Sequence, residues 1–544
     1  MVALPQEIID HIVSFLPRNY PSFNEEARNY FPRCASVSRQ FQLAIEWHTF
    51  DRLTASSDNT QLRNLRHVLD PRRRSYLREI RYQIILPRAK QVLFSAFEQP
   101  EERHVNDEAF TLAIKQLFRV LQPQEQLPRG IHLCIQNIVS PSDAFIGKQF
   151  VWRRFQRSRI KLLVKPEQLP LLPNVSVLTL FRTAHFLDPR TIIDIATRLP
   201  HLKAMNLVFN AREFVYSELA ERDRRSLADA INEHTEALKR VTKVRLFLVS
   251  DGGPINQLMP MPRFVWDGTY DYLGSTLRRW SRGLESLELQ GNFDGTLFWP
   301  HRSEPEFKGY RSTLKHSKLK RLNVSLERYT PSSVSNFVTY APALVCTKES
   351  YLPVMTVTFD SLNSWWYFMP FFETEYGVQL QESVDMKFPL LSSKEECKRL
   401  METEKAWGIK TQSIPRLDRL PRTEPVSETI NPLIESWARA LMWMPELEES
   451  SLTFMPQRDL TDRDDTASDD VHYNWTWEWK IIYLAPNTTN SQWGWIGDDE
   501  DKKCRRLIFC GVREWQPYDA IMRLLYQAGK RAHPHTDMVI IELG

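Results

Sequence analysis

The hydrophobic pattern at the start of the chain predicts two short amphipathic helices. After Leu4 and Pro5, apolar residues stand at positions 8, 9, 12, 13, 15 and 16, a spacing that gives a helix a broad apolar face. Beyond a proline-containing stretch from Pro17 to Pro32, a second helical spacing is formed by Cys34, Val37, Phe41, Ala44 and His48. A unit of about fifty residues buries only a modest share of its surface. These faces therefore need a partner, either the rest of the chain or another protein.

Short apolar segments that predict strands recur through the middle of the chain. Five have the form L-x-x-L-x-L with conservative replacements: Val175/Leu178/Leu180, Leu202/Met205/Leu207, Val241/Val244/Leu246, Leu284/Leu287/Leu289 and Leu319/Leu322/Val324. Helices are predicted between them at residues 189–199 and 213–240, and earlier strands at residues 77–86 and 131–138. The pattern is that of a leucine-rich repeat. The spacing of 27 to 43 residues is longer and less regular than usual, so strands of an ordinary α/β domain remain an alternative.

The last part of the chain, residues 351–544, is rich in tryptophan. We expect a separate unit or a cap on the repeats, with helices at residues 431–443 and 517–528 and strands at residues 475–484, 505–510 and 538–543. The indoles of Trp475, Trp477 and Trp479 share one face of a predicted strand, which is more typical of a buried sheet face than of a ligand platform. The acidic run at residues 459–470 is expected to form a loop.

Two stretches near the N-terminus resemble the F-box family. The first is Leu4-Pro5-x-Glu7-Ile8-Ile9-x-x-Ile12, and the second is Cys34-Ala-Ser-Val37-Ser38-Arg-x-Phe41 with a closing Phe50. The resemblance implies an all-α F-box at residues 1–50 that docks on a Skp-family adaptor and through it on a cullin. It implies these docking residues: Leu4, Pro5, Ile8, Ile9, Ile12, Leu16, Val37, Ser38 and Phe41. The sequence departs from the family in a longer segment between the helices and in Glu46-Trp47-His48.

These observations predict a mixed α/β protein with three parts. An F-box is followed by an irregular leucine-rich-repeat-like body of strands and helices at residues 75–345, and then by the Trp-rich, acidic part at residues 351–544. The resemblance implies a substrate-recognition adaptor of an SCF-type cullin-RING ubiquitin ligase, whose body binds a protein substrate. The alternative is a non-ligase scaffold that binds protein partners while its first helices pack on its own body.

Composition and charge are those of an ordinary globular protein. The 544 residues are 42% hydrophobic and 25% charged, with a net charge of +4. Basic residues are in excess up to residue 350 and acidic residues beyond it, which favours contact between the two parts or an acidic partner. Basic runs at residues 72–74 and 153–165 are interpreted as solvated helix faces, because the near-neutral total gives little attraction to phosphate. We do not expect nucleic acid as a partner.

The sequence shows no motif of a catalytic, cofactor or metal site. A glycine-rich phosphate loop, a G-x-S-x-G elbow and an H-E-x-x-H pair are missing from it. The six scattered cysteines are expected to be reduced thiols. Charged residues interrupt the first apolar stretch, and no long window is apolar enough for a bilayer. We therefore expect an intracellular, non-catalytic protein of the cytoplasm or nucleus, with no membrane partner and no cofactor.

Overall fold

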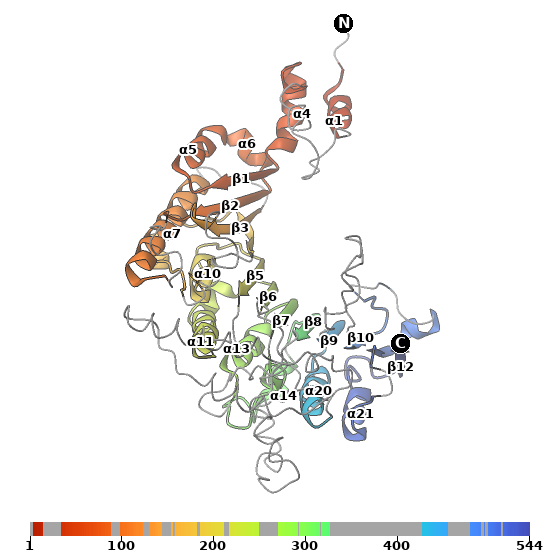
Figure 1. The fold of residues 1–544 in the computed structure, drawn as a ribbon. Coiled ribbons are helices and arrows are strands. Elements are labelled where there is room, and N and C mark those ends of the chain that lie inside the picture. Colours follow the sequence, from red (N-terminus) through yellow and green to blue (C-terminus); the bar gives the residue numbers. More distant parts are fainter. Residues whose placement is uncertain are drawn as a thin grey trace, which may run out of the picture.

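The computed structural model describes most of the chain before residue 327 and most of it after residue 426. The described residues are 4–14, 34–88, 98–122, 130–143, 154–155, 158–181, 185–210, 217–249, 270–291, 293–315, 317–326, 427–454, 479–490, 494, 499–512 and 515–543. Two helices, α1 (Gln6–Ser14) and α4 (Arg39–Thr49), stand at the N-terminal end, next to a long layered body (Figure 1). We call α1, α4 and the residues Leu4 and Pro5 the helix pair.

Within the described residues, twelve strands form one sheet in which spatial order follows sequence order. The pairs from β1–β2 to β8–β9 are all parallel, as is β11–β12, whereas β10 runs antiparallel to both β9 and β11. The strands are β1 (Arg52–Ser56), β2 (Glu79–Ile85), β3 (Ile131–Val139), β4 (Val175–Leu180), β5 (Ala204–Asn210), β6 (Lys243–Val249), β7 (Ser286–Gly291), β8 (Arg321–Leu326), β9 (Glu449–Phe454), β10 (Trp479–Leu484), β11 (Arg505–Cys510) and β12 (Met538–Leu543). The protein is therefore mixed α/β.

Helices occupy many of the connections and lie along one side of the sheet (Figure 1). They are α5 (Asn59–Val68), α6 (Pro71–Tyr76), α7 (Pro100–Leu121), α10 (Pro189–Ala196), α11 (Ser217–Glu233), α12 (Thr235–Leu238), α13 (Tyr272–Ser281), α14 (Tyr310–Leu314), α20 (Ser427–Leu441) and α21 (Asp519–Tyr526), with short 3-10 turns η2 (Pro166–Gln168), η3 (Gly295–Leu297) and η6 (Asp499–Lys503). Among the described helices, none combines the length and the apolarity needed to cross a membrane.

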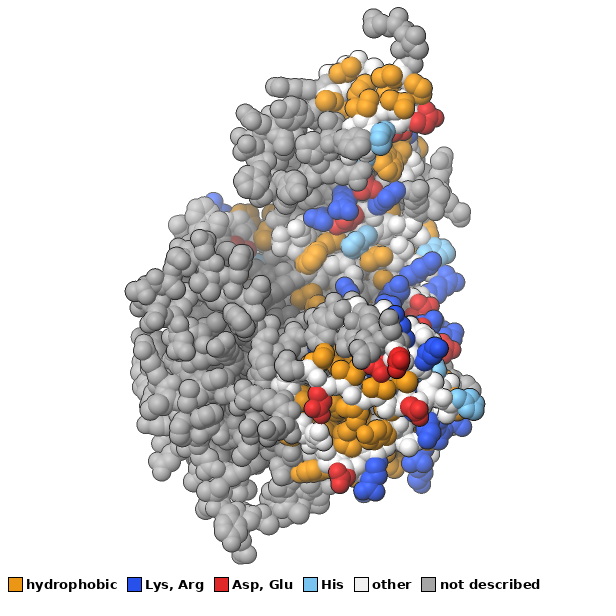
Figure 2. Space-filling model, turned by 90° about the vertical axis from the view of Figure 1, so that its right-hand side faces the viewer, with side chains coloured by type: hydrophobic (Ala, Val, Ile, Leu, Met, Phe, Trp, Pro, Cys, Tyr) orange, Lys and Arg blue, Asp and Glu red, His pale blue; other side chains and the backbone are white. Residues whose placement is uncertain are grey.

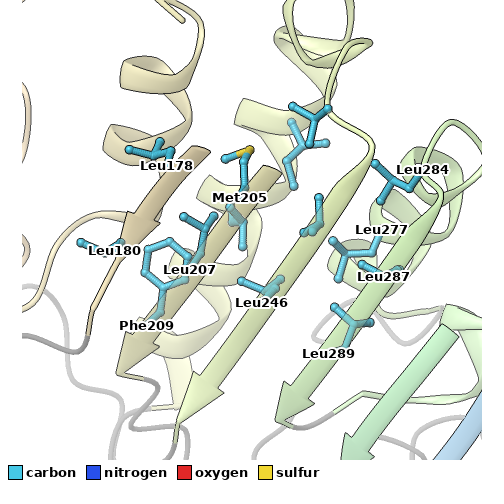
Figure 3. Packing of buried hydrophobic residues seen from close by; sticks show 14 of the residues in the cluster. Leu178, Leu180, Met205, Leu207, Phe209, Leu246, Leu277, Leu284, Leu287 and Leu289 are labelled. Atoms are coloured by element: carbon cyan, nitrogen blue, oxygen red, sulfur yellow. The ribbon is translucent and has the colours of Figure 1, made fainter. Parts of the chain in front are cut away.

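The five predicted L-x-x-L-x-L strands are confirmed as β4 to β8, which are neighbours in the sheet. Their central residues pair in one continuous row: Leu178, Met205, Val244, Leu287 and Leu322. A second row lies two residues further on, and every member of both rows is at most 4% exposed. Figure 3 shows several of these side chains gathered between the strands and the helices. Alternation along each strand and the parallel register together give this layered core.

The residues that directly precede neighbouring strands are joined by backbone hydrogen bonds. The backbone N–H of Thr242 donates to the carbonyl of Lys203 at 2.8 Å, and that of Glu285 donates to Thr242 at 2.7 Å. The same step continues from Lys320 to Glu285 and from Glu448 to Lys320. This ladder of turns keeps the strands in register although the segments between them differ in length.

The C-terminal strands continue the same sheet, because β9 pairs with β8. The predicted strand, helix and strand at residues 505–543 are confirmed as β11, α21 and β12, and the helix at residues 431–443 as part of α20. Trp479 is buried and lies 5.0 Å from the ring of Trp515, which fits a sheet face and not a ligand platform. Trp475, Trp477 and the acidic run at residues 459–470 lie outside the described residues.

The interpretation of the second basic run as a solvated face is wrong for two of its arginines. Arg154 and Arg159 are 2% and 3% exposed. Arg154 forms an ion pair with Glu102 in α7, and Arg159 pairs with Asp223 in α11. A buried guanidinium is tolerated when a carboxylate compensates its charge, so these arginines connect body helices and are not available to a phosphate backbone.

Candidate docking surface on the N-terminal helices

Local capping starts the two helices of the helix pair, and two glutamine side chains connect them. Backbone N–H groups of Ile8 and Ile9 donate to the carbonyl of Pro5 at 3.1 and 3.3 Å, which starts α1. Ser38 caps α4, since its hydroxyl accepts from the N–H of Phe41. The Gln6 side chain donates to the carbonyl of Gln40, and the Gln40 side chain donates to that of Leu4. These contacts hold the turn before α1 against α4.

The core of the helix pair is small. Ile9, Val13, Ala44 and Ile45 are 1% to 3% exposed and form a cluster separate from the main core of the body. Phe41, with Cys34 and Ala35, is partly buried against this cluster. Two helices form a single layer, so each can bury only the face that meets the other.

A neighbouring face of α1 carries exposed apolar side chains. Leu4, Ile8 and Ile12 are 49%, 47% and 42% exposed, and Val37 beside α4 is 70% exposed. Ile8 and Ile12 are four residues apart and therefore lie on one side of α1, and Leu4 precedes the helix; we call these three residues the apolar stripe. Figure 2 shows hydrophobic side chains gathered on this end of the molecule. A set of large apolar side chains grouped on one surface is typical of a binding site.

The nine residues implied for adaptor docking therefore fall into three groups. Leu4, Pro5, Ile8, Ile12, Val37 and Ser38 are exposed. Ile9 is inside the helix pair, Phe41 is partly buried there, and Leu16 lies outside the described residues. Ile9 thus supports the surface from beneath and does not belong to it.

The junction that fixes the helix pair to the body was not predicted from the sequence. Glu46 in α4 is 5% exposed and receives the guanidinium groups of Arg72 and Arg73, the latter at 2.7 Å. Gln42 donates to the same carboxylate at 3.0 Å. Burial alone would raise the pKa of Glu46, but the hydrogen bonds from Arg73 and Gln42 and the two positive charges lower it.

Two aromatic contacts reinforce this junction. The Arg73 guanidinium lies 4.9 Å from the ring centre of Phe50, and that of Arg78 lies 5.6 Å from Trp47. The basic run at residues 72–74 is therefore not the freely solvated face that its composition predicts. Glu46 belongs to the tripeptide that departs from the F-box pattern, and this departure is the signal that could have pointed to the junction.

From β4 to β9, the sheet face opposite the main core is a second surface and carries polar side chains. Side chains there contact one another across neighbouring strands: the Asn206 amide donates to Thr179 at 3.2 Å, Arg245 pairs with Glu288 at 2.6 Å, and Ser451 donates to Asn323 at 3.0 Å. Arg245 remains largely exposed. This face has the hydrogen-bonding capacity of a protein-binding surface.

Two cavities of the described body differ in size and lining. One of about 30 Å³, at the carboxyl ends of β4 to β6, is lined by the Arg159–Asp223 ion pair and has room for little more than a water molecule. Burial raises the pKa of Asp223 there. An open groove of about 660 Å³ beside β1 and β2 is lined by Thr54, Ala55, Ser56, Ser57, Asp58, Gln83 and Ile85. Among the described residues, no group of histidine, cysteine and acidic side chains is placed to hold a metal ion.

Of the described surfaces, the apolar stripe is therefore the one whose side chains most clearly indicate a binding site. Neither the comparison with protein-family models nor the comparison with curated proteins gives a match.

Proposed function

We propose that the chain is the substrate-recognition adaptor of an SCF-type cullin-RING ubiquitin ligase. In this proposal the helix pair is an F-box that docks on a Skp-family subunit, and the body is a leucine-rich-repeat-like array that binds a protein substrate. The observation that supports it most is the exposed apolar stripe of Leu4, Ile8 and Ile12, on a helix pair whose own core is complete without them.

The arrangement of the body supports the repeat description. Strands β4 to β8 follow one another in parallel, their leucine-type residues share rows, and the same turn recurs before each strand. A repeat array presents an extended surface for protein binding. The polar sheet face described above is the surface that we assign to the substrate.

The geometry of the junction also favours an adaptor over the alternative scaffold. In that alternative the first helices pack on their own body and need no partner. Here Glu46 ties α4 to α6, while Leu4, Ile8 and Ile12 stay exposed. An adaptor requires this combination of a fixed base and a free apolar face.

The test is capture of a purified Skp-family adaptor by the full-length chain. We expect the double variant Ile8→Glu, Ile12→Glu to bind at least about tenfold more weakly, because docking would bury two unpaired carboxylates. The matched control is Val105→Glu, Leu112→Glu on α7, where the two apolar side chains are 46% and 52% exposed.

Two results would contradict the proposal. If the wild-type chain did not capture the adaptor, the scaffold function would replace the ligase function. If the Ile8→Glu, Ile12→Glu variant captured the adaptor as well as the control variant does, the apolar stripe would not be the interface.

A further inference from the structure

Three cationic side chains converge on one indole at the C-terminal end of the body. The guanidinium carbon of Arg531 lies 3.3 Å from the centre of the Trp443 ring, that of Arg311 lies 5.7 Å away, and the Lys315 ammonium lies 5.8 Å away. We call these four residues the Trp443 cluster. All three cations are exposed, and Trp443 is half-buried.

The cluster is assembled from three distant parts of the sequence. Arg311 lies in α14 and Lys315 directly follows it, Trp443 follows α20, and Arg531 lies beyond the end of α21. Figure 1 shows α14, α20 and α21 as neighbours on the helix side of the sheet. Helix packing therefore fixes the position of the indole, and the cations come to it from both sides of α20 in the sequence.

Charge in the Trp443 cluster is not balanced by nearby carboxylates. Arg311, Lys315 and Arg531 form no ion pair with an acidic side chain in the described part of the chain, which sets them apart from arginines such as Arg278, paired with Glu304 and Glu306. Three like charges around one ring repel each other, and the ring quadrupole offsets this only in part. Binding of an anion would remove the repulsion.

We propose that the Trp443 cluster binds an acidic segment of a protein partner. Two guanidinium groups can each hold a carboxylate in a bidentate geometry, and the half-buried indole adds an apolar contact. A nucleic acid fits less well, because its affinity depends on many phosphate contacts along a basic stripe and the chain carries a net charge of only +4. Resting on the proposed function, the acidic segment belongs to a protein partner of the ligase that contacts the helix side of the body.

The experiment measures fluorescence anisotropy of a labelled peptide with the full-length chain. The probe is a peptide of about ten residues in which glutamate alternates with glycine; the same peptide with glutamine, and a single-stranded oligonucleotide of equal length, serve as comparison ligands. We expect binding of the acidic peptide alone, weakened as salt rises from about 50 to about 300 mM.

Two matched double variants distinguish binding at the Trp443 cluster from attraction to the overall positive charge of the chain. Arg311→Gln, Arg531→Gln should weaken binding at least about tenfold. Arg225→Gln, Lys239→Gln removes the same charge from exposed residues already paired with Glu221 and Glu236, and should leave affinity within about twofold. Thermal melting confirms that both variants fold.

Three outcomes would overturn the proposal: no binding of the acidic peptide, an equal loss in both double variants, or binding of the oligonucleotide in its place. Adaptor capture by the same variants keeps this result separate from the proposed function. If the chain binds the acidic peptide through Arg311 and Arg531 but does not capture the adaptor, the proposed binding site stands and the proposed ligase function is contradicted.

Discussion

Apolar side chains are buried throughout the core of the body, whereas in the helix pair only some of them are. In the body, Leu178 and Leu287 are 0% and 1% exposed, because strands meet a layer of helices. In the helix pair, Ile9 is 2% exposed while Ile8, the adjacent residue, is 47% exposed. A layered body can cover its apolar rows, but two helices can cover only the faces that meet. Apolar exposure on α1 therefore follows from the lack of a covering layer among the described residues and not from weak hydrophobic character.

Buried charge shows the same contrast. The body buries complete ion pairs, such as Arg278 with Glu304, whose side chains are at most 2% exposed. In the described helix pair the buried acidic residue is Glu46, and its cationic partners come from the body. Buried charges of the body are therefore compensated within it, whereas the buried charge of the helix pair is compensated by arginines of the body.

The largest effect is expected from a truncation in the body core. Leu178→Ala removes buried methyl groups from the central row of the sheet and should lower the free energy of unfolding by about 2–5 kcal/mol. Chemical denaturation followed by tryptophan fluorescence measures this. A loss below about 1 kcal/mol would mean that the body core is as loosely packed as the surface of α1, and the contrast between the two regions would disappear.

A buried acid in the body should make stability depend on pH. Asp294 caps η3, and its Oδ2 atom is buried without a hydrogen-bond partner among the described residues. Burial, together with the negative charge of Asp271, raises the pKa of Asp294 from 3.8 to about 8. Folding then takes up a proton between these pH values, so the free energy of unfolding falls as pH rises through this range.

Asp294→Asn should remove this dependence. The variant is expected to match the wild type near pH 4 and to become progressively more stable than it up to pH 8, as followed by thermal melting. Asp519→Asn, an exposed acid in the first turn of α21, is the control. A constant difference between Asp294→Asn and wild type across this range would show that Asp294 is ionised in the folded protein.

Sequence patterns predicted the rows of the sheet well, because each L-x-x-L-x-L segment places Leu178, Met205 and their equivalents on one face without information from elsewhere. The short β1 was not predicted, since Leu53 and Ala55 alone give too little pattern. Helix α7 was also missed.

For the candidate surface, the sequence predicted a set of residues but not which of them are exposed. Positions 8, 9, 12 and 13 form one broad apolar arc, so the periodicity of α1 does not separate Ile8, which is exposed, from Ile9, which is buried. The contact of Glu46 with Arg73 joins residues 27 positions apart and leaves no periodic signal. Likewise, the run around Arg154 resembled a solvated face because its partner Glu102 lies 52 residues away.

A smaller effect is expected at the junction between the two regions. Glu46→Gln keeps the size of the side chain but removes the charge that Arg72 and Arg73 share, which should cost about 1–3 kcal/mol locally. Hydrogen exchange should become faster in α4 and α6 and stay unchanged in β4 to β8. Glu101→Gln, in the first turn of α7, is the control. Unchanged exchange in α4 would mean that the aromatic contacts alone hold the helix pair.

The smallest effect on stability is expected on the apolar stripe. Ile8→Ala shortens a side chain that is already 47% exposed, so the free energy of unfolding should change by no more than about 0.5 kcal/mol. Ile9→Ala, one position along, should instead unfold the helix pair, because Ile9 is one of the four residues of its core cluster. Circular dichroism and hydrogen exchange over α1 distinguish the two. If Ile8→Ala destabilised α1 as much as Ile9→Ala does, the stripe would be packed against the chain itself, and no free face would remain for a foreign subunit.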